Sequence, residues 1–147
     1  MEISRATVAD AEVIATILNE IQEYYGDRPA PQELDQIKDA LFGERPLATV
    51  LLARDGAEVL GFASYTLLWP ASGAHTSLYL KELFVRAAAR RRGVARALMA
   101  ALREAARDAG CTRIEWTADT DNPPALALYE ALGAAPLPVK VFYRTRL

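Results

Sequence analysis

Arg90, Arg91 and Arg92 form a run of arginines directly before Gly93, at the start of a long amphipathic helical pattern. Guanidinium groups match phosphate oxygens in paired hydrogen bonds. The first turn of a helix presents unpaired N–H groups at the positive end of the helix dipole. Gly93 and the small Ala95 allow a ligand to approach the backbone closely, so these features together suit a pyrophosphate. A solvated charge run beside a helix is an equally good interpretation of the local pattern alone.

Glu82 is a candidate general base because it lies in a strand-like run with apolar neighbours, residues 78–85. Strict alternation along a strand predicts that Glu82 shares a face with Leu80 and Phe84. A carboxylate among apolar side chains has a raised pKa, which suits proton abstraction directly or through a water. The alternative is an exposed glutamate on a sheet edge, or a partner of Lys81.

Tyr129 is a second candidate for proton transfer. It follows Asn122 by seven residues, about two helical turns, in a helical pattern that opens with Pro123 and Pro124. A phenol at this place can act as an acid. A tyrosine on an amphipathic helix is more commonly a core residue whose hydroxyl finds a partner, and that interpretation stays open.

Hydrophobic periodicity predicts the elements that position these side chains. Strands are expected at residues 3–5, 48–54, 58–69, 78–85, 112–118 and 139–146. Helices are expected at residues 7–25, 31–43, 93–109 and 122–132. Thr7 and Asp10 have the spacing of a capping box, and Asp55 with Gly56 marks a hairpin. This order predicts an α/β fold with one mixed sheet and helices on both faces, in a single domain over residues 1–147.

The composition excludes several classes of function. The net charge of −2 gives no basic field that would draw the protein to nucleic acid or to an anionic membrane. The single Cys111 and the single His75 provide neither a disulfide nor a zinc ligand set, so no metal is expected. No apolar run reaches the ~18–20 residues of a membrane span, and the N-terminus lacks a secretory pattern. A cytoplasmic location is therefore expected.

The segment from Arg90 to Ala95 fits the Gln/Arg-x-x-Gly-x-Gly/Ala pattern and resembles the GNAT superfamily of N-acetyltransferases. The resemblance implies a mostly antiparallel sheet whose fourth and fifth strands splay apart. Residues 78–85, 121–134 and 4–11 resemble, respectively, the fourth strand, the C-terminal motif and the opening of the diamine (spermidine/spermine) acetyltransferase subgroup. The similarity therefore covers essentially the whole chain.

The same resemblance implies roles for individual residues. Acetyl-CoA would be the co-substrate, with its pyrophosphate held by a segment made of Arg90, Arg91, Arg92, Gly93, Val94, Ala95 and Arg96. Backbone groups of Leu83, Phe84 and Val85 would contact the pantetheine and the thioester carbonyl, and Asn122 the pantetheine arm. Tyr129 would be the acid and Glu82 the base. The acceptor pocket would be lined by Glu20, Glu23, Tyr24, Tyr25 and Glu82, although a polar helix end is an equally good interpretation of the first four.

The predicted function is transfer of the acetyl group from acetyl-CoA to a primary amine of a small molecule, either a diamine or a lysine-like amine. Lys81 stands where the diamine subgroup has an acidic residue, which argues against capture of a long polycation. One alternative is acetylation of a protein N-terminus or lysine, and another is a non-catalytic module that senses acyl-CoA. A homodimer could form by pairing of the expected last strand, residues 139–143, between subunits.

Overall fold

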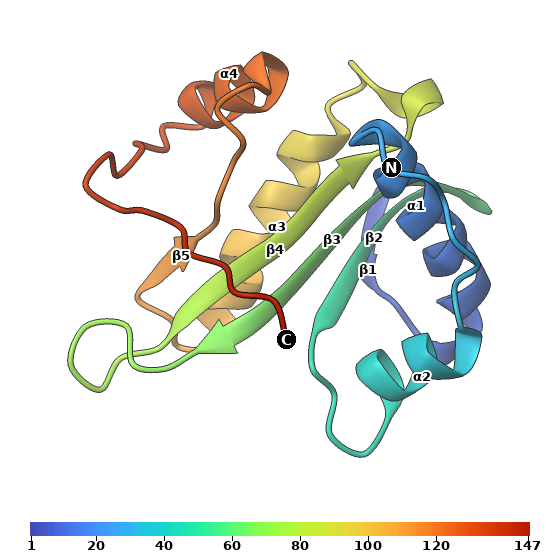
Figure 1. The fold of residues 1–147 in the computed structure, drawn as a ribbon, viewed down its shortest axis with the longest axis horizontal. Coiled ribbons are helices and arrows are strands. Elements are labelled where there is room, and N and C mark those ends of the chain that lie inside the picture. Colours follow the sequence, from blue (N-terminus) through green and yellow to red (C-terminus); the bar gives the residue numbers. More distant parts are fainter. The chain divides into compact units, whose positions relative to one another are not determined.

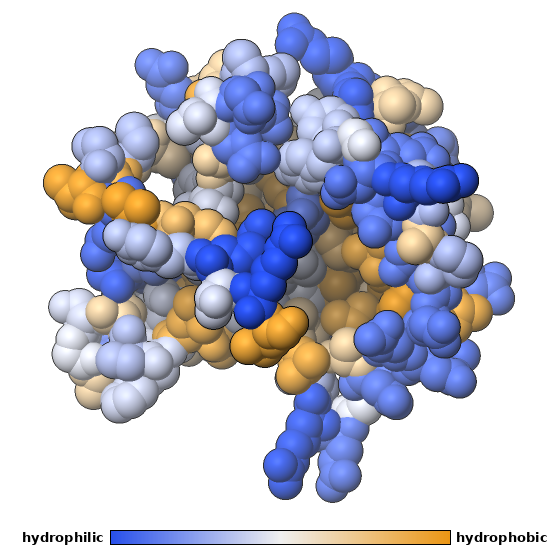
Figure 2. Space-filling model, in the orientation of Figure 1, coloured by the Kyte–Doolittle hydropathy of each residue, from blue (hydrophilic) through white to orange (hydrophobic).

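The computed structural model describes all residues, Met1–Leu147. The chain divides into two compact units, Met1–Thr117 and Ala118–Leu147, and each is described by itself. The prediction of one domain over 1–147 stays a prediction. Hydrophilic side chains cover most of the face seen in Figure 2, with apolar residues between them in smaller patches.

Five strands in the order β1-β2-β3-β4-β5 form the sheet of the first unit (Figure 1). They are β1 (Glu2–Arg5), β2 (Thr49–Asp55), β3 (Glu58–Leu68), β4 (Ser77–Val85) and β5 (Arg113–Glu115). The first four pair antiparallel, and β5 runs parallel to β4. The mixed sheet is the one predicted. The hairpin at Asp55 is also confirmed, since this residue pairs with Glu58 across the β2–β3 turn.

Three helices cover the two faces of this sheet. They are α1 (Ala11–Tyr24), α2 (Leu34–Phe42) and α3 (Val94–Asp108), with short 3-10 turns at Val8–Asp10 and Ala87–Ala89. One face packs Phe62 into a core with residues of α1 and α2, among them Ile14 and Ile37. Gly61, the preceding residue, faces the other way, because a Cβ there would meet Val94 and Leu98 of α3. Helices therefore lie on both faces, as predicted (Figure 1).

The fourth and fifth strands pair over a short stretch only. Ser77, Leu78 and Tyr79 lie opposite Arg113–Glu115, and β5 ends there, shorter than the predicted 112–118. From Leu80 onward β4 has a strand neighbour on the β3 side alone. The rest of β4 therefore offers backbone N–H and C=O groups along its other edge.

The second unit contains one helix, α4 (Pro123–Ala131). The Asn122 carboxamide oxygen caps it by accepting from the Ala125 N–H at 3.4 Å, and the prolines at its first positions match the predicted start. The predicted strand over 139–146 was wrong, since no strand forms after α4. Alternating apolar residues favour a strand only where a neighbouring strand takes up the backbone hydrogen bonds, and none of the five strands pairs with this segment. None of the helices combines the length and apolar composition that crossing a bilayer requires.

The Asp10 carboxylate ties the start of α1 to the sheet. One oxygen accepts from the Thr7 N–H at 2.8 Å in the predicted capping box, and the other lies 2.6 Å from Nη2 of Arg54 on β2. Burial by itself raises the pKa of Asp10, but the Thr7 hydrogen bond and the Arg54 guanidinium outweigh burial and lower it. The charged form therefore stabilises the folded state.

We expect Asp10→Asn to lower the free energy of unfolding by about 1–3 kcal/mol at pH 7, the usual range for a hydrogen bond to a charged group. Because the folded-state pKa is depressed, the contribution of Asp10 is fully present above the unfolded-state value of about 3.9. It is lost as the pH falls through the lower folded-state value. Urea unfolding from pH 7 into acid should show the gap to wild type closing, with Asp39→Asn as an exposed control. A gap of constant size at every pH would contradict this account.

Candidate functional site

The segment before α3 has the backbone of an anion cradle. Arg91 and Gly93 both have positive φ, at 66° and 78°, and Arg92 between them does not. Such alternation turns successive N–H groups toward one side and forms an anion-binding concavity. The first helical hydrogen bond runs from the Ala97 N–H to the Gly93 carbonyl at 3.0 Å, which leaves the preceding amides without intrahelical acceptors. A Cβ at Gly93 would meet nothing within 4 Å, so the space in front of the backbone is open.

The four arginine side chains of this segment fall into two groups, those with a partner in the protein and those without one. Arg90 donates from Nε to the Val85 carbonyl at 3.3 Å, and its guanidinium carbon lies 5.1 Å from the centre of the Tyr24 ring. Arg92 forms an exposed ion pair with Asp55 at 3.1 Å. The exposed side chains of Arg91 and Arg96 make no such contact within the protein. Arg91 and Arg96 are therefore free of contacts beside the cradle, while Arg90 has contacts but no carboxylate partner.

The strand residues predicted to contact pantetheine lie where β4 has a neighbouring strand on one side only. Leu83, Phe84 and Val85 pair with β3 on one side, and β5 pairs no further than Tyr79 on the other. The Val85 carbonyl already accepts from Arg90 at this end. The strand leads directly through residues 86–90 into the cradle.

A β-bulge at Lys81 puts Leu80 and Glu82 on opposite faces of β4. Tyr65 pairs with Leu80, and the next residue back along β3, Ser64, pairs with Glu82, so Lys81 has no partner in the ladder. Directly paired residues share a face and neighbours alternate, and a bulge shifts this alternation by one residue. The prediction that Glu82 shares a face with Leu80 was therefore wrong. The prediction that Glu82 shares a face with Phe84 is consistent with the register.

The face that carries Glu82 is the one covered by α1 and α2, because Phe84 belongs to the core on that side. Glu82 itself is half-buried. Its position two residues from Phe84 corresponds to about 6–7 Å along the strand. The candidate base therefore lies on the α1 side of the sheet.

A hollow of about 520 Å³ opens at the end of α1, beside Phe84. Three groups of residues line it: Glu20, Glu23 and Tyr24 on α1, Phe84 and the segment Arg86–Arg90 after it, and Glu58 at the start of β3. The Tyr24 ring packs edge-on against Phe84, with ring centres 6.1 Å apart, and against Tyr25 at 5.2 Å. Three of the predicted acceptor residues thus meet in one hollow, while Tyr25 does not line it and contacts the Tyr24 ring.

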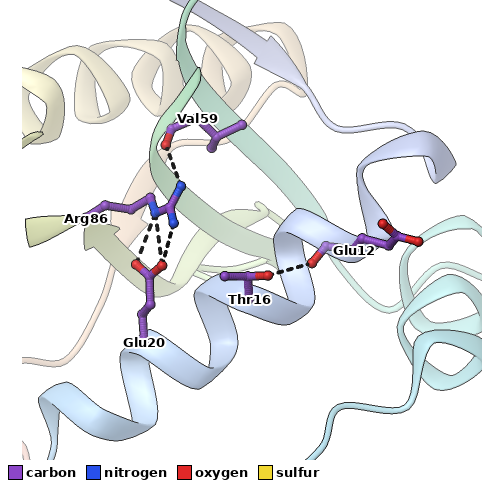
Figure 3. A network of polar contacts seen from close by, with 5 residues as sticks. All are labelled: Glu12, Thr16, Glu20, Val59 and Arg86. Atoms are coloured by element: carbon purple, nitrogen blue, oxygen red, sulfur yellow. Dashed lines mark hydrogen bonds and ion pairs between the residues drawn. The ribbon is translucent and has the colours of Figure 1, made fainter. Parts of the chain in front are cut away.

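Arg86 joins the hollow to the sheet through contacts that no sequence pattern indicates. Its guanidinium makes three hydrogen bonds to the Glu20 carboxylate, of which the shortest is 2.6 Å, and donates to the Val59 carbonyl at 3.3 Å (Figure 3). The hydrogen bonds that Arg86 donates to Glu20 raise the pKa of Arg86, although burial opposes this. Glu20 is thus neutralised within the fold. It was predicted to attract an amine, and its ion pair with Arg86 leaves it less able to do so. Glu23 and Glu58 line the same hollow without forming a salt bridge, although the charge of Glu58 also helps to raise the pKa of Arg86.

Two predicted residues belong to the second unit. Asn122 is the cap of α4, and Tyr129 lies half-buried in the same helix. The carboxamide of Asn122 is engaged with the Ala125 amide.

We expect the Glu20–Arg86 pair to be energetically coupled. A double-mutant cycle of Glu20→Gln and Arg86→Gln, followed by urea unfolding, should give a coupling energy of about 1–2 kcal/mol, because several charge-assisted hydrogen bonds act in a partly buried place. The exposed pair of Glu104 and Arg107 is the matched control and should give about 0.2–0.5 kcal/mol. Equal coupling in both cycles would contradict a structural role for Arg86.

Comparison with known proteins identifies the family. A model described as the acetyltransferase (GNAT) family matches residues 14–134. Thialysine N-epsilon-acetyltransferase of Caenorhabditis elegans is 42% identical over 55 residues, which cover 37% of this chain and 34% of that enzyme. The uncharacterised N-acetyltransferase YhfO of Bacillus subtilis (strain 168) is 29% identical over 136 residues, covering 90% and 89%. The structure of an integron cassette protein from the mobile metagenome of V. cholerae has a TM-score of 0.85 at 33% identity, covering 99% and 91%. The chain therefore belongs to the acetyltransferase (GNAT) family of acyltransferase enzymes.

Proposed function

We propose that this protein transfers the acetyl group of acetyl-CoA to a primary amine of a small molecule, a diamine or a lysine-like amine. The observation that carries the proposal is the adjacency of two features in the first unit. The anion cradle at residues 91–96 is joined by the segment Arg86–Arg90 to a hollow with carboxylates and an aromatic ring. Carboxylates and aromatic faces both attract an ammonium group.

Acetyl-CoA, the co-substrate of GNAT enzymes, fits the donor set at the cradle. The amides of residues 91–96 and the side chains of Arg91 and Arg96 would hold the pyrophosphate. Of the three residues Leu83, Phe84 and Val85, the first and last would hold the pantetheine arm and the thioester oxygen with their amides. The Arg86 N–H bonds to the Leu60 carbonyl on β3, so by alternation the Phe84 N–H also faces β3. The N–H groups of Leu83 and Val85 therefore face the free edge of β4. Arg90 is engaged elsewhere in the structure, so its side chain is not needed for this set.

The chemistry requires a proton to leave the acceptor, because an alkylammonium with a pKa near 10 cannot attack a carbonyl. We assign that proton to the Glu82 carboxylate, directly or through a water. Acetyl-CoA supplies the acetyl group, whose carbon gains a bond to nitrogen and loses its bond to sulfur. Backbone N–H groups of Leu83 and Val85 stabilise charge on the carbonyl oxygen. The Tyr129 hydroxyl gives its proton to the departing sulfur. The nitrogen loses its second proton as the C–S bond breaks, and this proton passes through solvent to restore the Tyr129 phenol. Asn122 contacts the pantetheine arm.

One relative supports an amine acceptor of the lysine type, since it is named for acetylation of the epsilon nitrogen of thialysine. The match covers 34% of that enzyme, so the acceptor of this chain is a proposal. Lys81 stands on the bulge of β4 and is exposed, and its positive charge opposes capture of a long polycation.

The test is mass spectrometry of products after incubation with acetyl-CoA and matched panels of small amines and peptides. We expect acetylated small amines and release of free CoA thiol. Acetylation of peptides alone would instead indicate a protein acetyltransferase. Tight CoA binding with no thiol release for any acceptor would indicate a non-catalytic sensor.

We expect Glu82→Gln to shift the pH–rate profile to higher pH. Without the carboxylate, the rate depends on the fraction of acceptor that is already neutral, and that fraction rises toward the pKa of the amine. The measurement is kcat/KM from pH 6 to 10 at saturating acetyl-CoA. Glu12→Gln, an exposed glutamate of α1, is the control and should keep the wild-type profile. A profile that stays in place in the Glu82 variant would exclude Glu82 as the base.

We expect Tyr129→Phe to lower kcat by about ten-fold or more, within the range typical of general acid catalysis. Its Kd for CoA, measured by calorimetry, should change less than about two-fold, since an interaction made only in the transition state does not affect ground-state binding. Tyr143→Phe, at an exposed residue near the C-terminus, is the control. An unchanged kcat would end the assignment of Tyr129 as the acid.

A further inference from the structure

Arg90 lies in the wall of the hollow, although its sequence context predicts a phosphate ligand. Its guanidinium lies over the Tyr24 ring at 5.1 Å, and its Nε bonds to the Val85 carbonyl. Neither partner carries a full charge, so the positive charge of Arg90 is not neutralised by a carboxylate. The hollow therefore contains an available cation as well as carboxylates.

The charges of the hollow are consequently of both signs. Glu20 and Arg86 neutralise one another at 2.6 Å. Glu23 and Glu58 line the same hollow without forming a salt bridge, although the charge of Glu58 helps to raise the pKa of Arg86. The carboxylate of Glu23 and the guanidinium of Arg90 are therefore left to meet a ligand, and Glu58 adds a negative charge that it shares with Arg86.

We propose that the hollow binds the α-amino-acid end of the acceptor, and that Arg90 is the residue that selects for it. Arg90 pairs with the α-carboxylate, while Glu23 and Glu58 attract the α-ammonium. This inference rests on the proposed function and narrows its acceptor to an amino acid with an amine at the end of its side chain. Guanidinium groups suit this task because they match a carboxylate with two parallel hydrogen bonds.

The placement of Glu82 agrees with this orientation. Glu82 and Phe84 share a face of β4 about 6–7 Å apart, and Phe84 lines the hollow. An acceptor held by its amino-acid end at the hollow has a four-carbon stem, if it is lysine, to extend along the strand. Its terminal amine would then approach the proposed base.

A diamine lacks the carboxylate with which Arg90 would pair. Its second ammonium can meet Glu23 or Glu58, but it leaves the guanidinium without a partner and places a like charge near it. Like charges within one site disfavour each other. Arg90 therefore acts as a specificity residue that favours the amino acid over its decarboxylated counterpart.

The experiment compares acceptors that differ by one charged group. Lysine carries both head groups, cadaverine lacks the carboxylate, and aminocaproate lacks the α-ammonium. With saturating acetyl-CoA, we expect kcat/KM of wild type to be about ten-fold or more higher for lysine than for cadaverine, as for loss of a charge-assisted hydrogen bond. The kcat/KM for aminocaproate should be lower than that for lysine, because aminocaproate keeps the carboxylate but lacks the α-ammonium.

The variants assign the preference to Arg90. Arg90→Gln should raise KM for lysine by about ten-fold with kcat little changed, since the contact is remote from the reacting atoms, and should leave cadaverine within about two-fold. Arg90→Lys keeps the charge and should retain part of the preference. Arg107→Gln, at an exposed arginine of α3 paired with Glu104, is the control and should keep the lysine-to-cadaverine ratio of wild type.

Two results would overturn the inference in distinguishable ways. Equal use of lysine and cadaverine by wild type, or a ratio that Arg90→Gln does not change, would refute selection by Arg90 and leave the transfer of acetyl to small amines intact. Acetylation of none of the three acceptors or of any other small amine would refute the proposed function, and the inference with it.

Discussion

The ion pair between Glu20 and Arg86 holds the end of β4 against α1, and both parts of the proposed site extend from that point. Arg86 is the first residue after β4, and its guanidinium also reaches the Val59 carbonyl on β3 (Figure 3). The segment Arg86–Arg90 lines the hollow beside Tyr24. It continues directly into the anion cradle before α3. A partly buried pair with several hydrogen bonds is suited to this task because its geometry is fixed.

The backbone of β4 supplies a second constraint. β5 leaves it after Tyr79, which frees one edge for a ligand. Glu82 shares with Phe84 the face that α1 and α2 cover. The bulge at Lys81 reverses the alternation beyond Glu82, so Leu80 lies on the opposite face, toward α3. The candidate base and the hollow are therefore on one face of the sheet.

Local patterns predicted much of the fold correctly, because the interactions behind them lie close in sequence. The capping box of Thr7 and Asp10, the hairpin after Asp55 and the start of α3 at Gly93 all depend on residues within a few positions. The local chemistry around Gly93 left two interpretations open, and the resemblance to a family motif decided between them.

Features that depend on distant partners were not predicted. Glu20 and Arg86 are 66 positions apart, and no periodicity indicates that they meet. The local sequence predicts that Arg90 binds phosphate, and only the structure reveals its contact with Tyr24. Alternation cannot reveal the bulge at Lys81, since the register depends on β3. The absent strand over 139–146 has the same origin, because a strand needs a neighbour that its own sequence does not specify.

The central claim is that the backbone before α3 binds the pyrophosphate of coenzyme A. Amide NMR of the full chain titrated with coenzyme A tests it most directly, because each N–H reports its own hydrogen bond. The account predicts that the largest shifts fall on the amides of residues 91–96, with smaller ones on Leu83 to Val85. Saturable binding that leaves the amides of residues 91–96 unshifted would contradict it.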